Sequence, residues 1–462
     1  MTNSKRVTVS DLRAILKLSL PLSFGYLGEV AIGFTDIIML GRLGPDALGA
    51  AGLAFSIYNV ILIIGIGMSF PAMVLISQAR GAGRSRAAHG IIRQGLWITG
   101  FLSVPSCAIL WHLEDILLLT GQDITLVEMA SRYMDYYLWT MPPALTSFMF
   151  LYALTSMERS ATIALVLWFD VGLNAVLNYL LIFGKFGFPA MGMAGAGLAS
   201  IIVYITSHMI FFGIFGFYRF FRSPVVFLRA WQPKGEILGQ FVRLGWPKGL
   251  ELLMVSGLYS GTALLAGRFG VQAIASHTIA YQLSLLIGIT ISIAVANAVA
   301  TRAGIAKGQD DFPELWRILN SGLSIIILFI VPLIVLIKIF SPWIVIVFAG
   351  SESKAQTLLP IAAPLIVLVA FFVLVDGLRM VIGMALNGLS DMKIPTLIAG
   401  VAHWVVGFPA GVMLGFTMEL GIQGLWWGLT ISMTVTAFAY LMRFRWMLAH
   451  GLSPVAGNDD KR

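Results

Sequence analysis

The segment Met39-Leu-Gly41-Arg42-Leu-Gly44-Pro-Asp-Ala47-Leu-Gly-Ala-Ala-Gly-Leu-Ala54 returns 226 positions later as Leu265-Ala-Gly267-Arg268-Phe-Gly270-Val-Gln-Ala273-Ile-Ala-Ser-His-Thr-Ile-Ala280. The same offset, without a gap, aligns Pro21 with Pro247. An apolar chain that repeats itself in halves is the usual build of a membrane transporter. The two halves supply two walls, and the site between them opens to either side.

Composition places the chain in a membrane. Of its 462 residues, 58% are hydrophobic and 11% are charged, whereas soluble domains carry about 25% charged residues. A helix needs roughly 20 apolar residues to span a bilayer. We therefore predict an all-α integral membrane protein whose twelve transmembrane helices form two pseudo-symmetric six-helix bundles. The twelve stretches are 12–40, 47–79, 91–112, 126–156, 160–184, 191–216, 238–267, 273–301, 315–341, 353–388, 394–417 and 421–447.

The charges of the connections test this division independently. One set of alternate connections, together with both termini, holds 21 of the 30 Lys and Arg residues, and the opposite set holds five. Positively charged loops stay in the cytoplasm, so we expect an inner (plasma) membrane protein with both termini cytoplasmic. The net charge of +8 follows from this bias and implies no nucleic-acid partner.

The same charges suggest how the chain is divided. We predict an N-terminal lobe at 1–217, a cytoplasmic basic linker at 218–237, a C-terminal lobe at 238–450 and a cytoplasmic tail at 451–462. The sequence has no nucleotide-binding Gly-x-x-x-x-Gly-Lys-Ser/Thr loop, no His-Glu-x-x-His or Gly-x-Ser-x-Gly motif, and a single Cys. We therefore expect neither an enzyme nor a cofactor, and no need for an ATPase subunit.

Polar residues inside the predicted spans are the functional candidates, because a charge at membrane depth is costly and normally faces a cavity or a partner. Asp36 stands near the outer end of the first span, and Glu29 lies on the same helix face. Asp170, Asn174 and Asn178 follow one another at intervals of four in the fifth span. If the two helices adjoin, these residues form a carboxylate–amide cluster suited to a proton or a cation. Otherwise, the amides join helix to helix.

The second half carries its acidic residues elsewhere. Thr262 takes the place of Asp36, while Glu251 appears in the seventh span and Asp376 in the tenth. Asp376 is a functional candidate, with an alternative structural role in an i, i+3 pair with Arg379.

Two further residues of the second half are candidates. His403 aligns with Asn174, and it either titrates near neutral pH or hydrogen-bonds helix to helix. Phe372 is among the aromatic residues that would line a pocket for an amphipathic cation. With Asp376 and Glu251, these residues would form a second charged patch or a substrate contact.

Several motifs resemble those of the multidrug and toxic compound extrusion (MATE) family, in its NorM-like branch, over nearly the whole chain. They are Ser19-Leu-Pro21 with Thr35-Asp36-x-x-Met39-x-Gly41-x-Leu-Gly44, Ser77-Gln78-Ala79-Arg80-Gly81-Ala82-Gly83, Asn174-x-x-x-Asn178-Tyr179-x-x-x-Phe183-Gly184-Lys185-x-Gly187, and Asn387-Gly388-x-x-Asp391-x-Lys393-x-Pro395.

The resemblance implies a V of two six-helix bundles that exports drug-like cations in exchange for Na⁺ or H⁺. It also implies that Asp36 is the first-lobe aspartate, with Asp36 and Asn178 as possible Na⁺ ligands, and that Asp376 is the second-lobe aspartate. Two positions depart from the family's second-lobe cation site, because Val255 replaces a glutamate and Phe372 a tyrosine. These departures favour coupling in the first lobe.

We thus expect a monomeric antiporter that exports organic, cationic compounds in exchange for H⁺ or Na⁺. Protonation of a buried aspartate removes its charge and its attraction for the substrate. The alternative is a flippase for a lipid-linked precursor, whose pyrophosphate would need several cationic residues in the cavity. The charges at membrane depth in this chain are mostly acidic.

Overall fold

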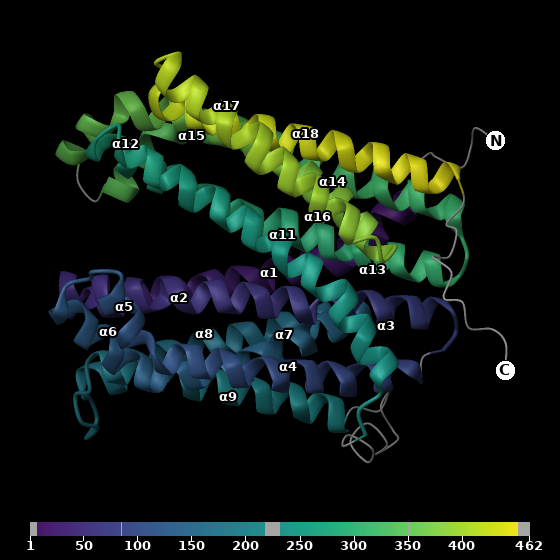
Figure 1. The fold of residues 1–462 in the computed structure, drawn as a ribbon, viewed down its shortest axis with the longest axis horizontal. Helices are drawn as coiled ribbons and strands as arrows, with labels where there is room; N and C mark the ends of the chain where they lie inside the picture. Colours follow the sequence, from purple (N-terminus) through teal and green to yellow (C-terminus); the bar gives the residue numbers. More distant parts are fainter. Residues whose placement is uncertain (1–6, 85, 218–231, 350–351, 451–462) are drawn as a thin grey trace. The chain divides into compact units, whose positions relative to one another are not determined.

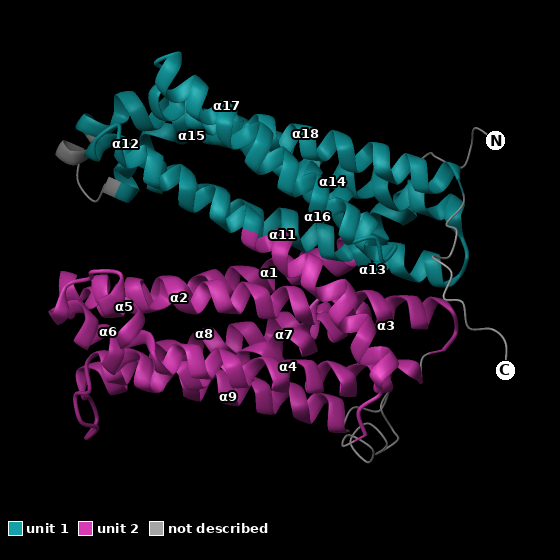
Figure 2. Ribbon diagram, in the orientation of Figure 1, with its two compact units in different colours: residues 1–15, 254–462 teal, residues 16–253 magenta. Residues whose placement is uncertain are grey.

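A computed structural model describes residues 7–84, 86–217, 232–349 and 352–450. Within these ranges the chain is built from helices and the turns that join them, with no strand (Figure 1). It divides into two compact units, one of residues 16–253 and the other of residues 1–15 and 254–462 (Figure 2). Each unit is described by itself.

The unit of residues 16–253 contains most of the first helix and every helix up to the start of α11. Its elements are α1 (Val9–Gly41, shared with the other unit), α2 (Pro45–Ser69), α3 (Pro71–Gly81), α4 (Ala87–Trp111), α5 (Leu113–Leu119), α6 (Ile124–Tyr137), the 3₁₀ turn η1 (Leu138–Thr140), α7 (Met141–Ser156), α8 (Ser160–Phe183), α9 (Met193–Phe217) and part of α11 (Gly235–Gly267).

The unit of residues 254–462 begins inside α11 and contains three stretches of π-helix. It continues with α12 (Val271–Ile287), π-helix η3 (Gly288–Ile293), α13 (Ala294–Gly308), α14 (Phe312–Ala349), α15 (Glu352–Gly388), α16 (Lys393–Gly400), π-helix η4 (Val401–Gly407), α17 (Phe408–Val412), π-helix η5 (Met413–Thr417) and α18 (Gly421–Ala449).

The predicted all-α membrane fold with twelve spans is confirmed. Eleven helices of the described ranges are long and apolar enough to cross a membrane. The twelfth is the predicted stretch 126–156, which the structure divides into α6, η1 and α7. Pro142 and Pro143 follow this break at the start of α7, where a missing N–H costs no helical hydrogen bond. The predicted stretch 47–79 likewise passes from α2 to α3 at Pro71.

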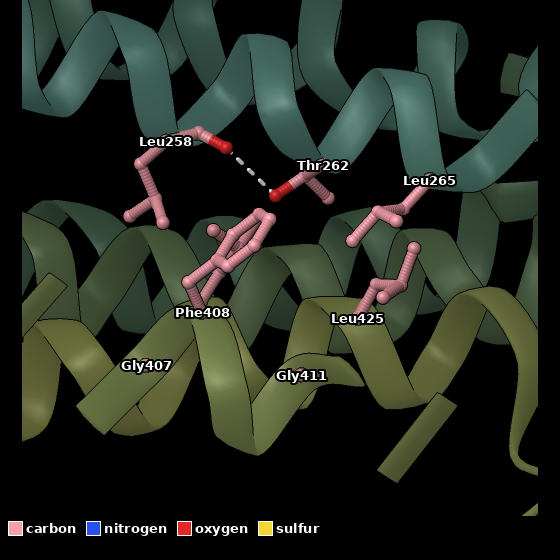
Figure 3. A pocket seen from close by; sticks show the side chains of 8 residues that line it. Leu258, Thr262, Leu265, Gly407, Phe408, Gly411 and Leu425 are labelled. Carbon is pink, nitrogen blue, oxygen red and sulfur yellow. Dashed lines mark hydrogen bonds between the residues drawn. The ribbon is translucent and has the colours of Figure 1, made fainter. Parts of the chain in front are cut away.

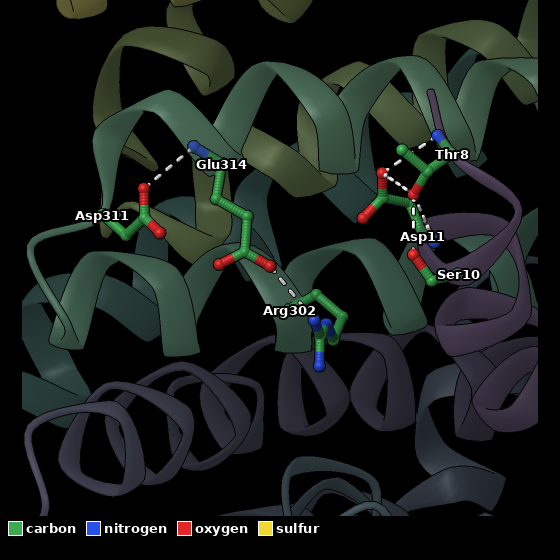
Figure 4. A network of polar contacts seen from close by, with 6 residues as sticks. All are labelled: Thr8, Ser10, Asp11, Arg302, Asp311 and Glu314. Atoms are coloured by element: carbon green, nitrogen blue, oxygen red, sulfur yellow. Dashed lines mark hydrogen bonds and ion pairs between the residues drawn. The ribbon is translucent and has the colours of Figure 1, made fainter. Parts of the chain in front are cut away.

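Side chains close the first turns of two helices in the unit of residues 1–15 and 254–462 (Figure 4). At the start of α1, Thr8 N–H donates to Asp11 Oδ2 at 3.1 Å and Asp11 N–H donates to Thr8 Oγ1 at 3.2 Å. This reciprocal pair is a capping box. At the start of α14, Glu314 N–H donates to Asp311 Oδ1, and the Glu314 carboxylate pairs with Arg302 of α13 at 3.1 Å.

Each unit fixes the end of one long helix with a basic side chain from another. Arg80, at the end of α3, donates to the backbone oxygen of Ser156, the last residue of α7. Lys307, at the end of α13, donates to the backbone oxygen of Leu389, directly after α15, at 2.6 Å. A cation at a helix C-terminus satisfies a free carbonyl and offsets the negative end of the helix dipole. The duplicated halves thus use the same device.

Glycine pairs bring helices into backbone contact. A Cβ added to Gly428 of α18 would lie 2.3 Å from Gly411 Cα of α17, and one added to Gly424 would lie 2.5 Å from Gly415 N of η5. Such distances leave no room for any other residue.

The division of the chain at 253/254 falls inside α11. Most of the predicted linker, 218–231, lies outside the described residues, as does the tail from 451. The predicted lobe boundaries therefore stay a prediction. Pro21 and Pro247, which the repeat aligns, lie inside the continuous helices α1 and α11.

Candidate functional site

Asp36 of α1 accepts two hydrogen bonds from α8. Asn174 Nδ2 donates to Asp36 Oδ1 at 3.0 Å, and Asn178 Nδ2 donates to the same oxygen at 2.7 Å. Asn178 Nδ2 also lies 3.2 Å from Asn174 Oδ1. The spacing of four places both amides on one face of α8, and both are buried, at 1% and 0% exposure. The structure therefore brings together the three residues that the sequence suggested as a carboxylate–amide cluster.

Asp170 and Glu29 lie elsewhere in the same unit. Asp170 is 3% exposed and hydrogen-bonds Ser207 of α9, and its Oδ1 has no hydrogen-bond partner among the described residues. Glu29 is exposed and lies within electrostatic reach of Tyr152 and Tyr204.

Tyr204 of α9 connects these acids, since it interacts electrostatically with Asp36, Glu29 and Asp170. Sequence reasoning missed it, although Tyr204 and Ser207 stand three residues apart in the predicted span 191–216. That spacing is the signal that would have placed them on one helix face.

A group of buried tyrosines packs beside Asp36. Tyr137 contacts Tyr133 and Tyr58, with ring centroids 4.8 Å and 4.7 Å apart. The Tyr58 hydroxyl lies 2.8 Å from Thr140 Oγ1. Tyr133 and Tyr137 both interact electrostatically with Asp36.

Asp36, Glu29 and Asp170 are in no ion pair among the described residues. Since a carboxylate inside a membrane is costly and normally faces a cavity or a partner, these three acids stay the functional candidates of this unit.

The two acids predicted for the second half are both paired with a base three residues along the same helix. Arg379 Nε donates to Asp376 Oδ1 at 2.7 Å, with side chains 6% and 9% exposed. Lys248 Nζ donates to Glu251 Oε2 at 3.0 Å. Glu251 belongs to residues 16–253, whereas Asp376 belongs to residues 254–462. The alternative raised for Asp376, an intrahelical pair, is thus what the structure contains.

His403 and Phe372 are both in the interior of the second unit. His403, on the π-helix η4, lies 2.6 Å from Ser432 Oγ through Nδ1. Because the Ser432 hydroxyl donates to Ala402 O at 3.0 Å, His403 Nδ1–H is the donor in that contact. Arg379 lies within electrostatic reach of His403. Phe372 is 1% exposed and contacts Tyr259 and Trp426.

The repeat shows what has replaced the Asp36 cluster in the second half. The offset of the repeat aligns Asp36 with Thr262. The offset that aligns Asn174 with His403 also aligns Asn178 with Gly407. Thr262 and Gly407 line one small pocket together with Phe408 and Leu425 (Figure 3). Thr262 Oγ1 donates to Leu258 O of its own helix at 2.8 Å. The equivalent place is therefore apolar.

Comparisons with known proteins point to one family. The MatE family model matches residues 21–180 and 247–413. A protein of Bradyrhizobium diazoefficiens named probable multidrug resistance protein NorM is 32% identical over 442 residues, covering 95% of this chain and 93% of that protein. A Synechocystis protein of the same name is 29% identical over 453 residues, covering 97% of each.

Solved structures share the fold at lower identity. The crystal structure of MATE in complex with MaL6 gives a TM-score of 0.86 at 22% identity, covering 95% of this chain and 97% of that one. A MOP superfamily transporter from Pyrococcus furiosus, described as having a binding pocket of reverse polarity, gives 0.86 at 21% identity and covers 96% and 99%. The fold is therefore the one found in these transporters.

Proposed function

Since the chain belongs to the MatE family, we propose that it is a secondary active antiporter that exports organic cations, including drugs or toxic metabolites, in exchange for H⁺. The names of its relatives, multidrug resistance proteins, support the class of substrate. The acids Asp36, Glu29 and Asp170, which are in no ion pair among the described residues, support the positive charge of the substrate.

One observation carries the proposal: Asp36 accepts two amide hydrogen bonds and has no basic partner among the described residues, whereas Asp376 and Glu251 each have one. Only a carboxylate without a fixed counter-ion can gain and lose a proton, or exchange one bound cation for another, during a transport cycle. Coupling is therefore assigned to Asp36 of the first half, with Asn174 and Asn178 as its positioning residues.

The geometry of the cluster favours a proton over Na⁺. Asn174 and Asn178 direct amide nitrogens at Asp36, which suits a carboxylate that gains and loses a proton, whereas Na⁺ takes oxygen ligands and would require the amides to turn their oxygens toward Asp36. An ionised carboxylate accepts both hydrogen bonds. When Asp36 takes up a proton, its charge and its attraction for an organic cation disappear together, and the substrate is released.

The exchange requires two conformations with different affinities. A proton shifts the balance between inward-open and outward-open states only if it binds one of them better. Glu29, Asp170 and Tyr204 extend the polar region from Asp36 along α1, α8 and α9, and we assign them to the path of the proton or the substrate. We further propose that the protein is a monomer of the inner membrane with both termini cytoplasmic, and that its lobes are 1–217 and 238–450.

The test is transport by the purified protein in proteoliposomes, with a pH gradient and a Na⁺ gradient imposed separately. We expect a fluorescent organic cation to move against its gradient when ΔpH is imposed and not when only ΔNa⁺ is imposed. Asp36→Asn should abolish this movement. Thr35→Val is the matched control, because Thr35 Oγ1 donates only to Ala31 O of its own helix.

Movement of the organic cation under a Na⁺ gradient alone would show that the coupling ion is Na⁺ and not the proton. Wild-type transport by Asp36→Asn would refute the assigned site. Movement of a lipid-linked pyrophosphate, with none of the organic cation, would establish the flippase instead.

A further inference from the structure

Asp376 and Arg379 form an ion pair inside the unit of residues 254–462. Arg379 Nε and Nη2 both reach Asp376 Oδ1 at 2.7 Å, on consecutive turns of α15. Both side chains are more than nine-tenths buried. A buried ion pair offers little net stability, because desolvation offsets the attraction. Its presence in a transporter core therefore calls for a role besides stability.

Aromatic rings enclose the region beside this pair. Five of them form a closed circuit from four helices, with successive centroids 5.2–6.4 Å apart. Phe372 precedes Asp376 by one turn of α15, and Tyr259 interacts electrostatically with both Asp376 and Arg379. In such surroundings charges interact far more strongly than in water. The five rings belong to Tyr259, His277, Tyr281, Phe372 and Trp426.

A buried hydroxyl lies beside Gly377, the residue that follows Asp376 on α15. Ser292, on the π-helix η3, is 1% exposed, and its Oγ has no hydrogen-bond partner among the described residues. A Cβ built on Gly377, the residue after Asp376, would lie 2.9 Å from this Oγ. Carboxylate, hydroxyl and phenol oxygens are ligands that hard monovalent cations accept. At Asp376, however, the guanidinium of Arg379 already occupies the position that a small cation would take.

We infer that Arg379 is a specificity-determining residue: a tethered cation that occupies Asp376 and keeps mobile monovalent cations out of the unit of residues 254–462. Arg379 lies on the same helix at fixed spacing, so its effective concentration at the carboxylate exceeds that of any free ion. Its charge is permanent. The inference deepens the proposed function, because it explains why cation exchange is confined to Asp36.

Binding of sodium-22 to the purified full-length protein tests this inference. All variants carry Asp36→Asn, so that any ion retained belongs to the second half. Arg379→Gln and Arg379→Met remove the tethered charge, and Arg379→Lys keeps it. The double variant Asp376→Asn/Arg379→Gln replaces the pair by neutral groups of similar size, and melting temperature in detergent reports whether each variant folds.

We expect the Asp36→Asn protein, Arg379→Lys and the neutral double variant to bind no Na⁺ saturably. Arg379→Gln or Arg379→Met should bind about one ion per protein, at least about tenfold more tightly than the parent, a difference of about 1.4 kcal/mol. A purely structural Arg379 would lower the melting temperature without creating this binding.

Two results would overturn the inference. In the first, the Asp36→Asn parent binds Na⁺ saturably and the neutral double variant does not. This comparison can be measured even if both single substitutions at Arg379 fail to fold. The other is a folded Arg379→Gln or Arg379→Met protein that binds no Na⁺. Neither readout depends on transport, so a failure of the antiport proposal would appear separately, in the proteoliposomes.

Discussion

Asn178 Nδ2 donates to Asp36 Oδ1 over 2.7 Å and thereby joins the C-terminal half of α8 to α1. Asn174 supplies the second hydrogen bond from one turn earlier. Two donors on one oxygen hold the carboxylate in a single orientation. Under the proposed function, the remaining oxygen, Oδ2, is the one that would take up a proton or contact a substrate.

The first prediction concerns this orientation. Replacing Asn178 by Leu removes the shorter hydrogen bond while keeping the side-chain volume. A hydrogen bond to a charged group contributes about 1.5–3 kcal/mol, and 1.4 kcal/mol is about a factor of ten. We expect Asn178→Leu to lower the initial rate of ΔpH-driven transport about tenfold or more. Asn174→Leu, which removes the longer bond, should have a smaller effect, and a larger effect of Asn174→Leu would contradict the assignment.

The second prediction uses an asymmetry in the buried contact of Tyr58 with Thr140. Thr140 Oγ1 donates to Tyr137 O at 2.7 Å, so the Tyr58 hydroxyl is the donor over the 2.8 Å to Thr140. Tyr58→Phe removes one hydrogen bond and leaves Thr140 satisfied, which should cost about 1 kcal/mol. Thr140→Val leaves the Tyr58 hydroxyl buried without an acceptor and should cost about 1–3 kcal/mol. Unfolding in detergent checks the order, and a larger loss for Tyr58→Phe would refute the assigned direction.

The spans and the Asp36 cluster were accessible from sequence for simple physical reasons. An apolar run of fixed length has to cross the bilayer, and each crossing reverses the side on which Lys and Arg accumulate. Asn174 and Asn178 follow from their spacing of four on an apolar helix. The sequence could state the meeting of α1 with α8 only as a condition, because it contains no information on which helices are neighbours.

Other features depend on contacts that the sequence does not reveal. The 3₁₀ turn Leu138–Thr140 interrupts an apolar run, and hydropathy does not register a change of hydrogen-bond pattern. Arg379 stands at i+3 from Asp376, a spacing that permits an ion pair without requiring it. Tyr204 reaches three acids from a helix that sequence reasoning treated as apolar.

The third prediction tests the basic residue that fixes the end of α15. Lys307 Nζ donates to Leu389 O at 2.6 Å, and Lys307→Met leaves that carbonyl without this donor. The loss should be about 1–2 kcal/mol. Lys393→Met is the matched control, because Lys393 is exposed, and its effect should stay within about 0.5 kcal/mol. Equal melting temperatures for the two variants would show that Lys307 contributes nothing to the end of this helix.

The fourth prediction concerns the backbone contact between α17 and α18. A Cβ on Gly428 would lie 2.3 Å from Gly411 Cα and 2.4 Å from Gly411 N, and backbone atoms cannot move aside as a flexible side chain does. Overpacking of this kind costs about 1–3 kcal/mol or more. We expect Gly428→Ala to lower the melting temperature and the yield of folded protein.

Gly100→Ala is the control for that substitution. Gly100 lies inside α4, and a Cβ there would meet nothing within 4 Å. Since alanine favours a helix over glycine by about 1 kcal/mol, Gly100→Ala should be neutral or slightly stabilising. If both substitutions lower the melting temperature equally, the close approach of α17 to α18 is not the cause of the loss at Gly428. If only Gly428→Ala lowers the melting temperature, the close contact with Gly411 is the cause of the destabilisation.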